Sequence, residues 1–259
     1  MRLINTETYK LETFLNNIPP YAILSHTWGE QEILFTDITD DLENAAKLKG
    51  WQKVVYCCRR ALEDGWQYAW IDTCCINKGD TTELGEAINS MFRWYEDAEV
   101  CYAYLADVPP RYYAGTGGVD EVGPWKWHLR SSRWFTRGWT LQELLAPTYL
   151  IFLDRTWGLI GSREELASEI QAISGITAKE LLNFKTCCLA TKLSWAVNRQ
   201  TTREEDRAYS LLGLLEVNMP LIYGEGERAF QRLQHELIRS YNDESILAWG
   251  CKPPFRKIG

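Results

Sequence analysis

YAILSH, at residues 21–26, is a short apolar run that follows Pro19-Pro20 and ends in polar residues. Such a run, bounded by turn-forming residues, is typical of a buried strand. Three further runs of this kind occur in the first half of the chain: YAWIDT (68–73), VCYAYL (100–105) and YLIFL (149–153). Because helical patterns separate most of these runs, we predict an α/β fold with a parallel sheet covered by helices on both faces.

Two helical segments of the first half are indicated by the spacing of their apolar residues. One spans about residues 42–62, and the other carries apolar residues at helical intervals from Leu84 to Tyr95. Asp80 and Glu83 have the spacing of a capping box at the start of the second helix. The Pro- and Gly-rich segment 109–123 predicts a mobile loop that lies over a site.

The second half of the chain has a different pattern, with three further capping-box spacings at Ser162/Glu165, Thr177/Glu180 and Thr202/Glu205. They predict helices over 163–173, 179–183 and 203–216, and a fourth helix is expected over 227–241. We therefore divide the chain into an α/β core at residues 1–154 and a helical extension at residues 155–259. The extension is expected to pack on the core.

Composition excludes several classes of function. The net charge of -7 argues against a nucleic-acid partner, and no apolar run is long enough for a membrane span. The eight cysteines lack the C-x2-C spacing of a zinc site, and the three histidines are scattered, so no metal site is expected. Without a secretory signal, we expect reduced thiols in a cytoplasmic protein. The ending CKPPFRKIG predicts a linker to further domains.

A candidate binding crevice follows from the predicted sheet. Ligands of open parallel sheets bind beyond the carboxyl ends of the strands. The residues at or after the first two strand ends here are Ser25, His26, Thr27, Trp28 and Asp72. Each of the polar residues could instead satisfy nearby backbone groups.

A second candidate is the stretch SRWFTRGWTLQELLAP (132–147). In a short helix ended by Pro147, Trp139 and Glu143 share one face and the leucines lie on the opposite face. From spacing alone, Glu143 is either a solvated charge or a functional carboxylate. Arg133 and Arg137, just before it, have no assigned role.

Several ordered motifs together resemble the fungal HET (heterokaryon incompatibility) domain: YAILSHTWGE, WIDTCCINK, SRWFTRGWTLQELLAP and TTREEDRAYSLLGLLEVNMPLIYGEGERAF. Domains of this family trigger cell death when incompatible strains fuse. The resemblance implies that the whole chain is one such domain, that it acts by self-association, and that NACHT and repeat regions follow it in a longer protein.

The first half also resembles, more distantly, a TIR domain. Residues 21–25, 71–72 and 77–80 correspond to its strand ends and polar loop, and Trp139 and Glu143 match its Trp-x-x-x-Glu pattern. This resemblance implies a TIR/flavodoxin-like open sheet and cleavage of the nicotinamide–ribose bond of NAD or NADP, with no tightly bound cofactor. Glu143 would be the catalytic residue. The substrate would contact Ser25, His26, Thr27, Trp28, Asp72 and Trp139.

Two alternatives remain open at this point. Cys74 or Cys75, with His26 and Asp72, would have the residue types of a nucleophilic cysteine site. The domain could also be a non-catalytic adaptor that signals through homotypic contacts, for example through the helix face from Leu84 to Tyr95.

Overall fold

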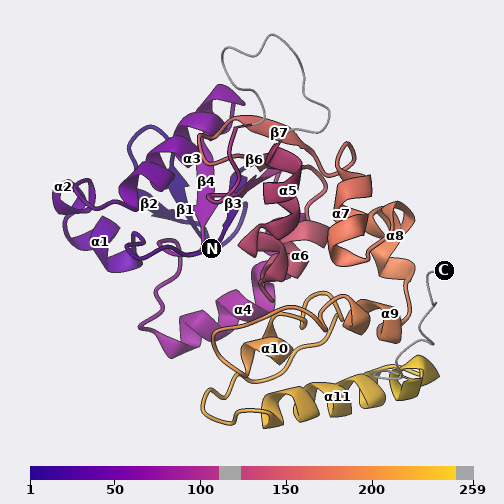
Figure 1. The fold of residues 1–259 in the computed structure, drawn as a ribbon. Coiled ribbons are helices and arrows are strands. Elements are labelled where there is room, and N and C mark those ends of the chain that lie inside the picture. Colours follow the sequence, from indigo (N-terminus) through magenta and orange to yellow (C-terminus); the bar gives the residue numbers. More distant parts are fainter. Residues whose placement is uncertain (111–123, 249–259) are drawn as a thin grey trace.

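The computed structural model of the chain describes residues 1–110 and 124–248 (Figure 1). Nearly all of the predicted loop at 109–123 and the predicted C-terminal linker lie outside the described residues. Among the described residues, no helix is both long and apolar enough to cross a bilayer.

The core is a sheet of seven strands in the order β2-β1-β4-β3-β5-β6-β7. Its strands are β1 (Arg2–Asn5), β2 (Leu11–Thr13), β3 (Ala22–His26), β4 (Tyr68–Ile71), β5 (Val100–Tyr104), β6 (Leu150–Leu153) and β7 (Leu159–Ser162). The four central strands β4, β3, β5 and β6 are parallel, and they are the four strands that the sequence predicts.

The α/β class is confirmed, but the expectation of an all-parallel sheet is wrong at both edges. β1 pairs antiparallel with β2 and β4, and β7 pairs antiparallel with β6. These three strands were not predicted because they are short and lack a long apolar run. Since β7 belongs to the sheet, the sheet continues beyond residue 154.

The order of the parallel strands creates a switch point beside β3. The chain crosses from β3 to β4 on one side, and then from β4 to β5 on the other side of β3. Right-handed crossovers therefore place α3 (Trp51–Glu63) on one face, and α4 (Thr81–Glu96) and α6 (Thr140–Leu145) on the other. α4 contacts α6, and α6 contacts β3. The carboxyl end of β3 therefore lies next to α6.

The remaining helices of the first half are short. They are α1 (Phe35–Asp40), α2 (Leu42–Ala45), α5 (Pro124–Ser131) and a 3-10 helix at Arg133–Thr136. The single helix predicted at 42–62 is wrong, because α2 and α3 are separate. Gly50 lies between them, and its backbone approaches Gln31 so closely that an added Cβ would lie 2.2 Å from the Gln31 carbonyl oxygen.

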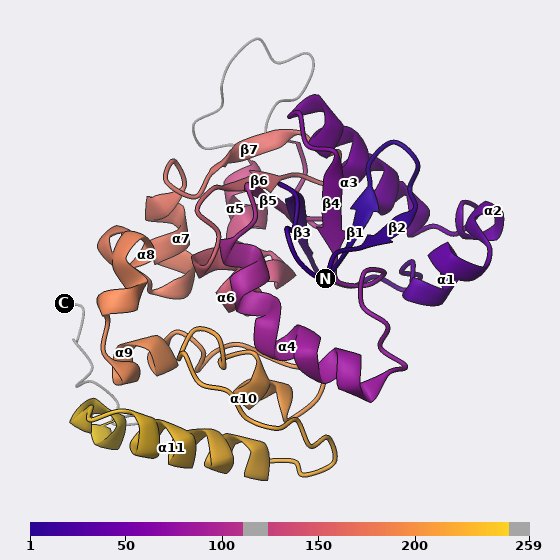
Figure 2. The ribbon, with the colours of Figure 1, turned by 180° about the vertical axis from the view of Figure 1, so that it is seen from behind.

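The extension contains five α-helices among the described residues. They are α7 (Ala167–Ser174), α8 (Ala178–Asn183), α9 (Leu189–Ser194), α10 (Asp206–Tyr209) and α11 (Arg228–Ser240), with 3-10 helices at Phe184–Thr186 and Glu244–Ala248. Figures 1 and 2 show α10 between α4 and the outermost helix α11. The extension thus covers the part of α4 that projects beyond the sheet.

Two of the predicted capping boxes differ in outcome. Both hydrogen bonds of the Thr177/Glu180 capping box are present at α8. The helix expected at 203–216 is wrong, since only α10 forms there. Glu205 does not cap with Thr202; its carboxylate instead accepts hydrogen bonds from the backbone N–H groups of Gly224 and Gly226.

Candidate active site

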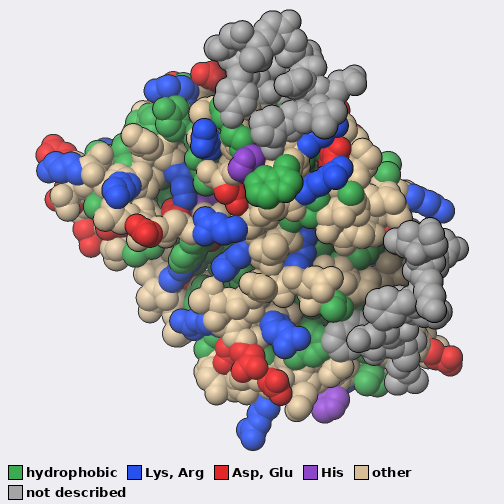
Figure 3. Space-filling model, in the orientation of Figure 1, with side chains coloured by type: hydrophobic (Ala, Val, Ile, Leu, Met, Phe, Trp, Pro, Cys, Tyr) green, Lys and Arg blue, Asp and Glu red, His purple; other side chains and the backbone are tan. Residues whose placement is uncertain are grey.

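A cleft of about 360 Å³ lies between the core and the extension. It opens beyond the carboxyl ends of β3 and β4 and is bounded by α4, α6 and the α10 region. Its lining residues are His26, Trp28, Asp72, Ile76, Lys78, Leu84, Ile88, Met91, Arg137, Trp139, Thr140, Glu143, Thr202, Arg203, Asp206 and Tyr223. Figure 3 shows Lys and Arg side chains gathered across the middle of one face of the molecule.

Glu143 is a buried residue and not a solvated helix charge. All six residues of α6 are buried, and Glu143 is 7% exposed. Its carboxylate accepts a hydrogen bond from the hydroxyl of Ser25, near the end of β3. That hydroxyl accepts one in turn from the Trp134 indole N–H at 2.7 Å. The Trp134 and Ser25 side chains therefore hold the Glu143 carboxyl group in a fixed position beside the cleft.

Burial also controls the charge of Glu143. Removal from water, reinforced by the nearby Asp72 carboxylate, raises the pKa of Glu143 to about 8. The hydrogen bond from Ser25 and the positive charges of Arg199 and Arg137 act in the opposite direction. The neutral carboxylic acid form of Glu143 is therefore favoured at pH 7.

His26 lies between two carboxylates at the end of β3. Its Nε2 is 3.5 Å from Glu32 Oε2, and its Nδ1 is 3.8 Å from Asp72 Oδ1. Burial raises the pKa of Glu32, but hydrogen bonding and charge from His26, together with Lys53, bring it well below its usual range. The imidazole is thus surrounded by negative charge on two sides.

Trp28, Asp72 and Lys78 form a second cluster in the cleft wall. The Trp28 indole N–H donates to Asp72 Oδ2 at 2.9 Å. The Lys78 ammonium lies 3.5 Å from the centre of the Trp28 ring and 3.6 Å from Asp72 Oδ2. Burial lowers the pKa of Lys78. Asp72 therefore interacts with both Trp28 and Lys78.

The opposite wall comes from the extension. The Arg203 guanidinium carbon lies 4.4 Å from the centre of the Tyr223 ring, and the Tyr223 hydroxyl donates to Asp206 Oδ1 at 3.0 Å. Burial raises the pKa of Asp206, against a hydrogen-bonding contribution from Trp139. A cation, a carboxyl group and an aromatic ring from the extension therefore border the same cleft as Glu143.

A half-buried arginine joins the two walls. Arg199 Nη1 donates to the backbone carbonyl of Arg137 at 2.8 Å and to Thr140 Oγ1 at 2.9 Å. Burial lowers the pKa of Arg199 to about 10, although the Glu143 carboxyl acts to raise it. Its positive charge is therefore close enough to favour the ionised form of Glu143.

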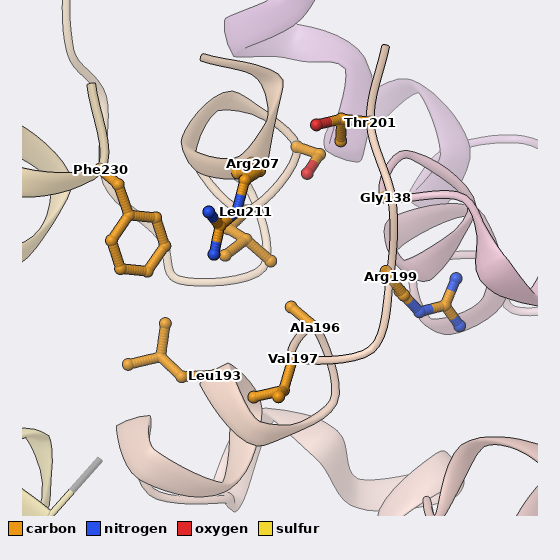
Figure 4. A pocket seen from close by; sticks show the side chains of 10 residues that line it. Gly138, Leu193, Ala196, Val197, Arg199, Thr201, Arg207, Leu211 and Phe230 are labelled. Atoms are coloured by element: carbon orange, nitrogen blue, oxygen red, sulfur yellow. The ribbon is translucent and has the colours of Figure 1, made fainter. Parts of the chain in front are cut away.

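A second hollow near Arg199 is too small for a substrate. It measures about 30 Å³, which is room for about one water molecule. Figure 4 shows apolar side chains around it, including Leu193, Leu211 and Phe230, and the Arg199 side chain directed away from them. The larger cleft is therefore the candidate site.

The cleft brings together most of the residues that the sequence singles out. His26, Trp28, Asp72, Trp139 and Glu143 line it, and Ser25 lies directly beneath Glu143. Thr27 is half-buried and is not among the lining residues.

Sequence reasoning missed the residues on the opposite wall. On that wall, the sequence predicts Thr202 and Arg203 only as the start of a helix. Arg137, on the core side of the cleft, has no role assigned from sequence, and Arg199 carries no prediction. The charged stretch TTREEDR and the turn YGEGER carried the available signal, but only the fold shows that both reach the cleft.

The cysteine alternative is not supported by the geometry. Cys74 and Cys75 are buried in the hydrophobic core, and neither lines the cleft. Burial raises the pKa of Cys74 well above its usual value, so the nucleophilic thiolate is strongly disfavoured. Within residues 1–110 and 124–248, no group of three or more His, Cys, Asp or Glu side chains could hold a metal ion.

Comparison with known proteins agrees with this set of motifs. Residues 21–116 match the sequence model of the family described as heterokaryon incompatibility protein (HET). The chain is 46% identical over 225 residues to the vegetative incompatibility protein HET-E-1 of Podospora anserina. The match covers 85% of this chain but only 16% of that much longer relative. No solved structure shows a significant match. The chain belongs to the heterokaryon incompatibility (HET) family.

Proposed function

We propose that this chain is a cell-death effector domain of fungal self/non-self recognition, and that it cleaves the nicotinamide–ribose bond of NAD or NADP after self-association in the cytoplasm. The observation that carries the proposal is the buried carboxyl group of Glu143, held by Ser25 beside a ligand-sized cleft. The Trp-x-x-x-Glu spacing shared with enzymatic TIR domains adds to this support. NACHT and repeat regions would follow the domain in the full-length protein.

The reaction requires little from the protein beyond a positioned negative charge. The bond between ribose C1′ and the nicotinamide nitrogen breaks, and its electron pair neutralises the pyridinium ring, so that nicotinamide leaves as a neutral molecule. The ribose becomes an oxocarbenium-like cation, as in glycoside hydrolysis. Glu143 would stabilise this cation. Water then adds to C1′ and releases a proton, giving ADP-ribose, or its 2′-phosphate if the substrate is NADP.

The raised pKa of Glu143 fits this role because the substrate itself is a cation at the reacting ring. A neutral carboxylic acid in a buried site loses its proton more readily when a positive charge is brought close to it. Trp28 and Trp139 line the same cleft and offer aromatic surfaces for the bases. The arrangement is thus suited to a positively charged substrate.

The competing proposal is a non-catalytic adaptor that acts only through homotypic contacts. The face of α4 from Leu84 to Tyr95 is largely covered within the chain, since Ile88, Met91 and Tyr95 are buried. This observation weakens the adaptor proposal.

The test is to incubate the purified chain, at concentrations where it self-associates, with NAD and separately with NADP, and to quantify free nicotinamide. We expect release by the wild type and none by Glu143→Gln, which keeps the size of the side chain and removes its charge. Glu86→Gln, an exposed position on α4 outside the cleft, is the matched control and should behave as wild type. Equal release by the Glu143 variant, or none by assembled wild type, would contradict cleavage; the second result would favour the adaptor.

A further inference from the structure

Arg137 lies where the core meets the extension, and its backbone is fixed there. The N–H of Gly138 donates to the Gln200 carbonyl at 2.8 Å, and the Gln200 N–H donates to the Thr136 carbonyl at 2.6 Å. The Arg137 carbonyl accepts the bond from Arg199. These contacts do not use the Arg137 side chain, which remains available to the cleft that it lines.

The Arg137 guanidinium has little to hold it within the protein. Its Nη1 donates to the Thr202 hydroxyl at 3.2 Å. No ion pair joins it to a carboxylate anywhere in the part of the chain that the structure describes. Lys78, across the same cleft, is paired with Asp72. Among the cations of the cleft, Arg137 thus has donors free for a ligand.

A hydroxyl lies beside Arg137, and a second cation lines the same cleft. Thr202 and Arg203 are exposed residues of the extension that line the same cleft. A guanidinium presents several N–H groups in a planar fork that matches the oxygens of a phosphate. Arg137, Thr202 and Arg203 therefore provide the donor types of a phosphate site, and the site requires both halves of the molecule.

We propose that Arg137, together with Thr202 and Arg203, binds the pyrophosphate of a dinucleotide whose ribose lies at Glu143. This inference rests on the proposed function for the identity of the ligand, but its geometry is independent of bond cleavage. In this proposal Arg137 determines the class of substrate, because the cleft binds ligands with a pyrophosphate more tightly than the free nucleoside.

The experiment measures binding by calorimetry to Glu143→Gln protein, so that no ligand is consumed. The probes are NAD, ADP-ribose, inorganic pyrophosphate and nicotinamide riboside, which has the ring and ribose but no phosphate. Adding Arg137→Met should weaken binding of the first three about 10- to 100-fold, the loss expected for a charge-assisted pair. The affinity for nicotinamide riboside should stay within about 2-fold of that of the Glu143→Gln parent. Arg137→Lys should restore part of the loss.

The matched control is Arg133→Met, four residues earlier. Its side chain is 67% exposed, its closest carboxylate is Asp107 at 3.9 Å, and it does not line the cleft. This variant should bind all four probes as the parent does. Melting temperatures of all variants establish whether the fold is retained.

The outcomes separate this proposal from the proposed function. Arg137→Met could weaken the binding of nicotinamide riboside as much as that of NAD, or leave the binding of ADP-ribose unchanged. Either result would show that the phosphate site is wrong, even if the wild type cleaves NAD. If the wild type cleaves nothing but its binding of ADP-ribose depends on Arg137, the phosphate site stands and the cleavage proposal fails. If no phosphorylated probe binds, the phosphate site is wrong, and nicotinamide release by the wild type decides the cleavage proposal separately.

Discussion

The sheet core and the C-terminal extension are held together by different kinds of interaction. In the core, parallel strands with entirely buried residues, such as β3 and β6, pair through backbone hydrogen bonds. In the extension, long segments lack regular secondary structure, and side chains form hydrogen bonds with their backbone N–H and carbonyl groups. Glu205 accepts from two backbone N–H groups, and the Tyr209 hydroxyl bonds the N–H and carbonyl of Ile222.

This difference explains why the cleft lies where it does. The core supplies a fixed edge with Ser25, His26 and Asp72, and the extension supplies side chains that reach that edge from a less regular framework. We expect the extension to unfold locally before the core does, because segments with few regular backbone hydrogen bonds have low local stability. The site therefore depends on docking of the extension to the core.

The largest effect is expected where the two regions approach most closely. A Cβ added at Gly213 of the extension would lie 2.0 Å from Cβ of Phe92 on α4. Gly213→Ala should therefore lower the free energy of unfolding by about 3 kcal/mol or more, since the backbone must move. Urea unfolding measures the loss. Hydrogen exchange should show faster opening in residues 195–240 than in the central strands.

Gly85→Ala is the matched control within α4. Nothing lies within 4 Å of a Cβ added at Gly85, which sits in a helix interior. This change should raise the free energy of unfolding by about 0.5–1 kcal/mol, because alanine is the better helix former. Similar unfolding curves for the two alanine variants would show that the close approach at Gly213 is unimportant.

A smaller effect is expected at Arg199, which links the extension to α6. Arg199→Met removes two hydrogen bonds from a half-buried position and should cost about 2 kcal/mol in the free energy of unfolding. It also removes a positive charge that favours ionised Glu143, so the pKa of Glu143 should rise further. Arg199→Lys keeps the charge and should reverse part of the pKa change. Loss of stability with an unchanged pKa of Glu143 would limit Arg199 to a structural role.

The smallest expected effect is the change in the free energy of unfolding that Glu143 causes between pH 6 and 7. Its folded-state pKa of about 8 exceeds the ordinary 4.5, so the folded state holds a proton that the unfolded state releases between these values. The stability that this residue contributes is therefore present at low pH and is lost as pH rises from 4.5 to 8, by up to about 1.4 kcal/mol per pH unit. The wild type should lose more stability than Glu143→Gln between pH 6 and 7. Parallel curves for the two proteins would contradict the raised pKa.

The central strands were predictable because each is a short apolar run that ends in polar residues. The edge strands β1, β2 and β7 carry no such local signal and exist because a neighbouring strand offers unpaired backbone groups. The helix expected at 203–216 failed for a related reason. The hydrogen bonds of Glu205 to residues near 225 outweigh a local cap, and no local pattern reveals a contact over twenty residues.

The candidate site was predictable to the same extent. The strand-end rule led to Ser25, His26 and Asp72, and helical spacing led to Trp139 and Glu143. Spacing could not show that Glu143 is buried, because every residue of α6 is covered by parts of the chain distant in sequence. The wall formed by Arg203, Asp206 and Tyr223 depends on how the extension docks, and docking has no local signature.

The most direct test of the account is the pH dependence of nicotinamide release from NAD, measured as kcat/KM for assembled wild-type protein with enzyme-free controls. This parameter reports the ionisation of essential groups in the free protein. Because the ionised carboxylate is the required form, kcat/KM should rise with pH, be half-maximal near pH 8, level off above about pH 9, and be abolished in Glu143→Gln. A profile that is flat between pH 6 and 9, or release by the Gln variant at the wild-type rate, would contradict the assignment of Glu143 as the catalytic residue.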